Sequence, residues 1–175
     1  MTLLSRAELV SLLEEVGAEL AGRGLRGDVF VVGGAALALA YNVRRSTRDL
    51  DAVFEPKQVV YEAARVVGAR RGLPADWLND AVKGFLPGAD PNATTLFERA
   101  GLTVRVASAP YLFAMKAAAA RVERDSQDIL YLYRMCGFSS VDEALACVEQ
   151  YYPAHVLPAK AGFLLRELLD PAADL

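Results

Sequence analysis

A short apolar run that stops at two consecutive glycines is the feature that most constrains this chain. The run, Asp28–Val32, is rich in valine and is typical of a strand buried on both faces. Gly33 and Gly34 follow directly, and Ala35–Tyr41 then holds strong helix formers without a breaker. The sequence therefore predicts a strand, a glycine turn and a helix in immediate succession.

The double glycine has two interpretations. One is a plain turn, because neither GxGxxG nor GxxxxGK[ST] is present and the Rossmann and P-loop motifs are therefore excluded. In the other, uncovered backbone N–H groups at the helix N-terminus bind phosphate, and the hydroxyls of Ser46 and Thr47 assist. The position of Gly33 and Gly34 between a buried strand and a helix favours the phosphate site.

Two aspartates, Asp49 and Asp51, lie on a second predicted strand, Asp49–Phe54. Alternate residues of a strand point to the same face, so the two carboxylates come together while Leu50 points away. Two like charges repel, and a divalent cation removes that repulsion. Mg²⁺ prefers such oxygen ligands, and Mn²⁺ is the alternative ion. The competing interpretation is a strand end that merely meets water.

Five further residues are candidates for contact with a nucleotide or an acceptor. Arg44, Arg45 and Arg48 directly precede the aspartates, where they could neutralise a triphosphate or an RNA backbone, or simply be solvated. Trp77 could stack on a base and Asn79 could line the same pocket. The alternative for Trp77 is a place in the core.

A second group of charged residues comes later in the chain. Lys116 lies among apolar side chains, where an unpaired ammonium would be costly, so it either reaches solvent or faces a charged site. Asp125 and Asp128 share one face of the following predicted helix. Acidic residues are also common near helix N-termini, which is the alternative for this pair.

The composition excludes several classes of protein. With 175 residues, 54% of them hydrophobic, the chain can bury one sizeable core, so we expect a single domain. No apolar stretch is long enough for a membrane span and no signal peptide is recognisable, so we expect a cytoplasmic protein without a membrane partner. A net charge of -3 argues against a nonspecific nucleic-acid coat. Two cysteines and the single histidine, His155, exclude disulfide frameworks and His-rich metal sites.

Periodicity and breakers predict an α+β protein, with an α/β core at 1–108 and a helical part at 109–175 packed on it in one compact domain. The further expected helices are Ser5–Leu20, Lys57–Arg71, one that begins within Pro74–Asp80, Tyr111–Val122, Asp125–Met135, Val141–Tyr151 and Ala159–Leu169. The further expected strands are Thr95–Arg99 and Leu102–Ala107.

Three segments together resemble a known family. "VVGGAALALAYNVRRSTRDLDAVF" resembles the GG…[ST]xDxD signature of the nucleotidyltransferase superfamily, in particular the minimal bacterial proteins related to AbiEii and MenT toxins. "LTVRVASAPYLFAMKAAAARVERDSQDI" is similar to the later block of that family, and "GLPADWLNDAVKGFLP" is similar to a segment of an uncharacterised branch. The resemblance spans Val31–Ile129.

The resemblance implies a fold and a set of roles. The fold is a mixed sheet flanked by helices, and the reaction is attack of an acceptor hydroxyl on the α-phosphorus of a nucleoside triphosphate, with loss of pyrophosphate. The implied roles are phosphate binding by Gly33, Gly34 and a hydroxyl of Ser46 or Thr47, magnesium binding by Asp49 and Asp51, triphosphate contact by Lys116, and completion of the site by Asp128 or Asp125.

The resemblance also leaves alternatives open. Many nucleotidyltransferases take a third metal carboxylate from a later strand, but Leu102–Ala107 supplies Arg105 and no acid. The chain is therefore either an active transferase, with tRNA 3′ ends as a candidate acceptor and an antitoxin as a candidate partner, or a degenerate fold that binds nucleotide or a protein. A simple interaction protein is the third alternative. The apolar C-terminal region would also allow a homodimer.

Overall fold

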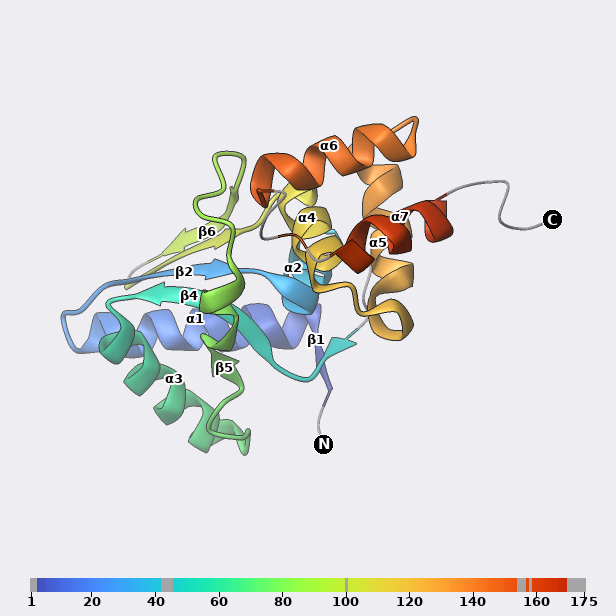
Figure 1. Cartoon of the computed structure of the whole chain (residues 1–175). Coiled ribbons are helices and arrows are strands. Elements are labelled where there is room, and N and C mark those ends of the chain that lie inside the picture. Colours follow the sequence, from blue (N-terminus) through green and yellow to red (C-terminus); the bar gives the residue numbers. More distant parts are fainter. Residues whose placement is uncertain (1–2, 42–45, 100, 154–156, 158, 170–175) are drawn as a thin grey trace. The chain divides into compact units, whose positions relative to one another are not determined.

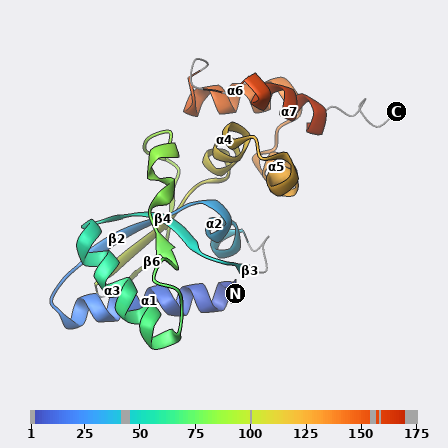
Figure 2. The same ribbon diagram turned by 60° about the horizontal axis from the view of Figure 1, so that its bottom comes forward.

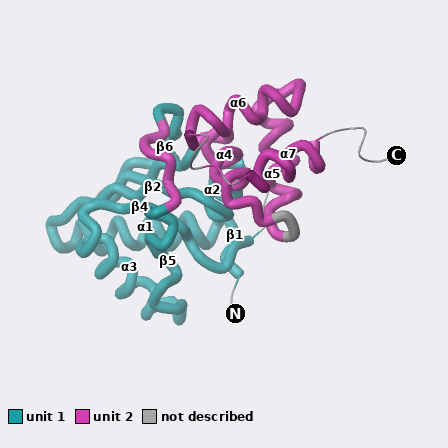
Figure 3. The backbone as a smooth tube through the Cα atoms, in the orientation of Figure 1, with its two compact units in different colours: residues 1–84, 91–107 teal, residues 85–90, 108–175 magenta. Residues whose placement is uncertain are grey.

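The computed structural model describes residues 3–41, 46–99, 101–153, 157 and 159–169 (Figure 1). The chain forms two compact units, one comprising Met1–Gly84 and Pro91–Ala107 and the other Phe85–Asp90 and Ser108–Leu175 (Figure 3). The first unit contains a mixed sheet with helices and the second is helical, so the predicted α+β class is confirmed. No helix in the described ranges is both long and apolar enough to cross a membrane.

The sheet of the first unit has five strands in a mixed order. Its strands, from one edge to the other, are β5 (Leu78–Asn79), β4 (Leu50–Glu55), β2 (Gly27–Val31), β7 (Leu102–Val106) and β6 (Thr94–Arg99). The central strand β2 is parallel to β7 and antiparallel to β4. A separate two-stranded pair joins β1 (Leu4–Ser5) to β3 (Ser46–Thr47). This order places the strand that precedes the glycines beside the strand that carries Asp51.

Two helices of the first unit, α1 (Arg6–Gly22) and α3 (Lys57–Arg71), pack together against one face of the sheet (Figure 2). Gly27 of β2 shows how closely α3 approaches the sheet, because a Cβ on Gly27 would lie 2.5 Å from Cγ2 of Val60 on α3. Along β4, every second side chain is buried and the side chains between them are more exposed. Asp51 belongs to the more exposed set and therefore lies on the sheet face that α1 and α3 leave uncovered.

The second unit comprises α4 (Ala109–Ala119), α5 (Val122–Cys136), α6 (Val141–Tyr151) and α7 (Ala159–Leu169). Hydrogen bonds fasten the segment 85–90 to these helices. The hydroxyl of Tyr152 donates to the Phe85 carbonyl at 2.6 Å, and Asp90 accepts from the backbone N–H of Ser108 at 2.7 Å. Asp90 thereby caps the start of α4, where Ser108 supplies no side-chain cap of its own.

Most of the predicted elements are confirmed, with shifts of a few residues at their ends. The capping box of Ser5 and Glu8 is present at the start of α1. The helix predicted to begin within Pro74–Asp80 is wrong, because a two-residue strand, β5, and a short 3₁₀ helix (Ala81–Phe85) occupy this region. The reason is tertiary: the Trp77 carbonyl accepts from Leu50 N–H at 2.7 Å, which ties this segment to the sheet.

Candidate functional site

The predicted phosphate site and the predicted metal site meet where β2 ends. The backbone N–H of Val32 donates to the carbonyl of Asp51 at 3.0 Å, and both glycines form the first turn of α2 (Gly33–Ala40). Gly33 has φ +63°, a left-handed conformation that side chains disfavour. A Cβ on Gly33 would lie 3.2 Å from Oδ2 of Asp51. The Asp51 carboxylate therefore lies directly against the backbone at the N-terminus of this helix.

The segment before β4 is held by the small β1–β3 pair. Thr47 faces Leu4 in that pair, is 8% exposed, and its hydroxyl donates to the Asp49 carbonyl at 3.1 Å. This bond fixes the backbone of Asp49 and occupies the Thr47 hydroxyl proton. Ser46, the other residue whose hydroxyl is predicted to hold phosphate, is half-buried. Asp49 itself lies just before the strand and is exposed, whereas the prediction placed it inside the strand.

The chemistry of Asp49 and Asp51 suits a hard divalent cation. Both supply carboxylate oxygens, Asp49 from the bend directly before β4 and Asp51 from the second residue of β4. Among the described residues, no three Asp, Glu, His or Cys side chains lie together in a way that could hold a metal ion. Two carboxylates leave coordination positions for phosphate oxygens and water, which matches how Mg²⁺ is held at phosphate-transfer sites. The residues present therefore fit Mg²⁺ shared between protein and substrate.

The strand next to Asp51 contains one of the predicted contact residues, whereas a second one, just before that strand, is buried. Asn79 of β5 is the register partner of Asp51, and its side-chain oxygen accepts from Ala81 N–H at 3.1 Å. Trp77 is only 1% exposed, and its indole N–H donates to the Ala64 carbonyl at 2.9 Å. The hypothesis that Trp77 contacts a base is therefore corrected: it is a core residue of the first unit.

The later charged group forms a compact cluster in the second unit. The ammonium of Lys116 lies 2.6 Å from Oδ1 of Asp125 and 2.9 Å from Oδ2 of Asp128. All three side chains are nearly buried, with 11% exposure for Lys116 and 7% for each aspartate. Sequence reasoning placed both aspartates on one helix face, but it did not foresee that both would bind the same lysine. Such a cluster holds each charge in a defined position.

Arg44, Arg45 and His155 lie outside the described residues, and Arg48 is exposed in the bend before β4.

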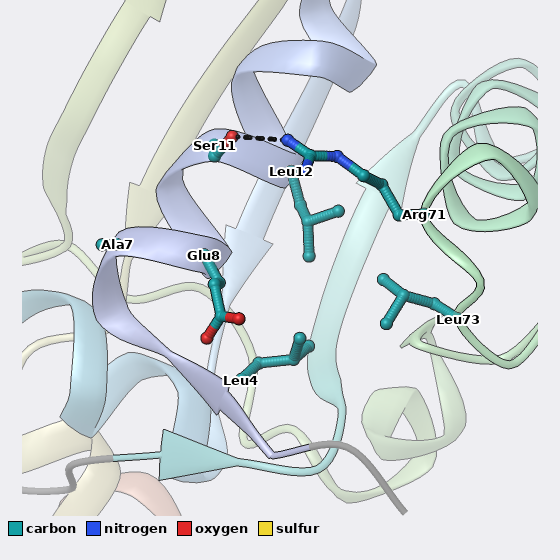
Figure 4. Close-up of a pocket in the computed structure, with 7 residues that line it drawn as sticks. All are labelled: Leu4, Ala7, Glu8, Ser11, Leu12, Arg71 and Leu73. Atoms are coloured by element: carbon teal, nitrogen blue, oxygen red, sulfur yellow. Dashed lines mark hydrogen bonds between the residues drawn. The ribbon is translucent and has the colours of Figure 1, made fainter.

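A pocket of about 310 Å³ opens between the first turns of α1 and the end of α3, and it contains none of the predicted site residues (Figure 4). Leucines form much of its lining, and Arg71 donates to the Ser11 hydroxyl at its rim.

One of three comparisons with known proteins found a match. The family model described as "Nucleotidyltransferase of unknown function (DUF6036)" matches residues 7–84. This segment is nucleotidyltransferase-like. The match includes both glycines and both aspartates, and it ends before the Lys116 cluster. It supports the nucleotidyltransferase class and not the narrower AbiEii/MenT assignment. No curated protein and no solved structure matches the chain.

Proposed function

We propose that this protein is a magnesium-dependent nucleotidyltransferase that transfers a nucleoside monophosphate from a nucleoside triphosphate to an acceptor hydroxyl. The observation that carries the proposal is the closeness of the Asp51 carboxylate to Gly33, where an added Cβ would lie 3.2 Å from Oδ2. It supports the proposal because a transferase needs a phosphate-binding backbone and a metal-binding carboxylate at the same phosphate group, and these are the roles proposed for Gly33 and Asp51. The family match over residues 7–84 supports the same class.

In this mechanism, backbone N–H groups at Gly33 and Gly34 donate to phosphate oxygens of the triphosphate. Asp49 and Asp51 would hold Mg²⁺, which supplies positive charge to the phosphate oxygens as negative charge develops. The contact with the Gly33 backbone and the bond from Thr47 to Asp49 restrict how far the two aspartates can move. The acceptor oxygen then forms a bond to the α-phosphorus and its hydroxyl proton passes to solvent, while the bond to the bridging oxygen breaks and pyrophosphate leaves.

Lys116 and Asp128, or Asp125, are proposed as further catalytic residues. Their near-complete burial as an ion cluster supports this role, because charged clusters of this kind are costly and are common at functional sites. The proposed acceptor is the 3′ end of tRNA, as for a toxin that a cognate antitoxin restrains. Arg48 and Asn79 are proposed contacts for the substrates.

The direct test is a transfer assay with an isosteric variant. The purified protein is incubated with Mg²⁺ and each α-labelled ribonucleoside triphosphate, with total tRNA and then the protein itself as acceptor. Asp51→Asn keeps the shape of the side chain but removes its charge, and we expect it to abolish transfer. Asp28→Asn is the matched control, because Asp28 is an exposed aspartate on the neighbouring strand β2. Transfer that persists in Asp51→Asn would refute the metal assignment.

A second candidate is a degenerate fold that binds nucleotide or a protein without chemistry. The observation that favours it is the absence of a third metal-binding acid beside the carboxylate pair among the described side chains. The same assay separates the two candidates. Label on RNA supports a tRNA-directed transferase, and label on protein points to a polypeptide acceptor. Magnesium-dependent nucleotide binding with no label on any acceptor would favour the degenerate fold.

A further inference from the structure

The sheet face opposite α1 and α3 carries an arginine near the end of the sheet at which the glycines lie. On β2, Phe30 is the register partner of Val53 on β4 and of Arg105 on β7. Directly paired residues point to the same face, so Arg105 shares the face that carries Val53 and Asp51. Because β2 and β7 are parallel, their carboxyl ends lie at the same end of the sheet, and α2 begins there at Gly33.

The position of Arg105 relative to the glycines follows from the strand order. The central strand β2 lies between β4 and β7, and neighbouring strands are about 4.8 Å apart. Asp51 therefore flanks the end of β2 on one side and the end of β7 flanks it on the other. Arg105 stands one residue before Val106, the partner of the last residue of β2. A triphosphate on the glycine backbone would have the carboxylates on one flank and this guanidinium on the other.

The state of the Arg105 side chain also suggests a ligand. Arg105 is exposed, and within the part of the chain that the structure describes its guanidinium makes no ion pair or hydrogen bond. Arg99, on the adjacent strand β6, instead pairs with Glu14 of α1 at 3.1 Å on the opposite face. The register partner of Arg105 on β6 is Thr95, an exposed residue whose hydroxyl can also donate. The acids on this face of β2 and β6, Asp28 and Glu98, both pair with Thr103, two residues before Arg105 and farther from the glycines.

We propose that Arg105 binds the phosphate chain of the nucleotide, an inference that rests on the proposed transferase function. A guanidinium presents paired N–H groups that match two phosphate oxygens, which a single ammonium cannot do. With two carboxylates available, one divalent ion leaves part of the negative charge of a triphosphate uncompensated. Arg105 supplies positive charge at this end of the sheet.

The test measures equilibrium binding, so it does not depend on the acceptor. Calorimetry with Mg²⁺ compares a nucleoside triphosphate with its monophosphate on the wild type, Arg105→Ala, Arg105→Lys and Arg99→Ala. We expect Arg105→Ala to weaken triphosphate binding roughly tenfold or more, the loss expected for a charge-assisted hydrogen bond, and monophosphate binding to change much less. Arg105→Lys should recover only part of the affinity, and Arg99→Ala should bind like the wild type. Circular dichroism and thermal unfolding establish that each variant is folded.

The outcomes separate this inference from the proposed function. If the wild type binds no nucleotide with Mg²⁺, the proposed function fails and the inference fails with it. If the wild type binds the triphosphate and folded Arg105→Ala binds it equally well, the inference alone is overturned. An equal loss in Arg99→Ala would also overturn it, because the effect would then reflect general surface charge.

Discussion

Replacing Gly33 by alanine tests the contact on which the candidate site depends. The residue has φ +63°, and a left-handed conformation costs an L residue roughly 1–2 kcal/mol. For a chain of this size, that loss predicts a melting temperature lower by roughly 2–8 °C. The added Cβ would also lie 3.2 Å from Oδ2 of Asp51, so the carboxylate must move by a few tenths of an ångström.

That displacement is comparable with the tolerance of a binding site, whose groups must be held within about 0.5 Å. We therefore expect Gly33→Ala to weaken magnesium-dependent triphosphate binding about tenfold or more, as measured by calorimetry. The matched control is Gly72→Ala. Gly72 has φ +66°, and a Cβ there would meet no atom within 4 Å, so this variant carries the same backbone strain without the contact.

The two variants together isolate the carboxylate contact. Both should lose similar stability in urea denaturation, and only Gly33→Ala should lose binding. If folded Gly33→Ala binds nucleotide like the wild type, the proposal that the phosphate site and the metal site lie together at the N-terminus of α2 is refuted. If Gly72→Ala loses binding to the same extent, the effect comes from stability and the argument from Asp51 fails.

Three further predictions concern stability, each measured by urea denaturation. Trp77→Phe removes the hydrogen bond to the Ala64 carbonyl and should lower the unfolding free energy by about 1–2 kcal/mol. Nucleotide binding should be unchanged, and weakened binding would instead support Trp77 as a base contact. Lys116→Met leaves two nearly buried aspartates without their cation and should cost about 3–5 kcal/mol, whereas a loss under about 1 kcal/mol would contradict the buried cluster. The hydrogen bond from Arg71 lowers the pKa of Glu15 below its ordinary value of 4.5, so this pair stabilises the fold above that pH and loses its effect as the pH falls through the lowered pKa. The stability difference between the wild type and Glu15→Gln should therefore shrink between about pH 6 and pH 3, and a constant difference would refute the assignment.

The local elements could be predicted because their signals lie within a few residues of one another. The capping box at Ser5, the bounds of α6 at Val141–Tyr151 and the strand that leads into the glycines all follow from short-range pattern. The segment around Trp77 could not be predicted in the same way. Its proline and acidic residues are typical of a helix start, but contacts with β4 and α3 hold it as a strand.

The candidate site shows the same division. The sequence by itself determined that two carboxylates alternate after a basic segment and that two glycines follow a buried strand, because these are properties of residue order. Only the tertiary structure decided that Asp51 lies against Gly33, that Arg105 shares its face of the sheet and that Lys116 binds two aspartates. The physical reason is that alternation sets the direction of each side chain along a strand, whereas its neighbours depend on which distant segments pair.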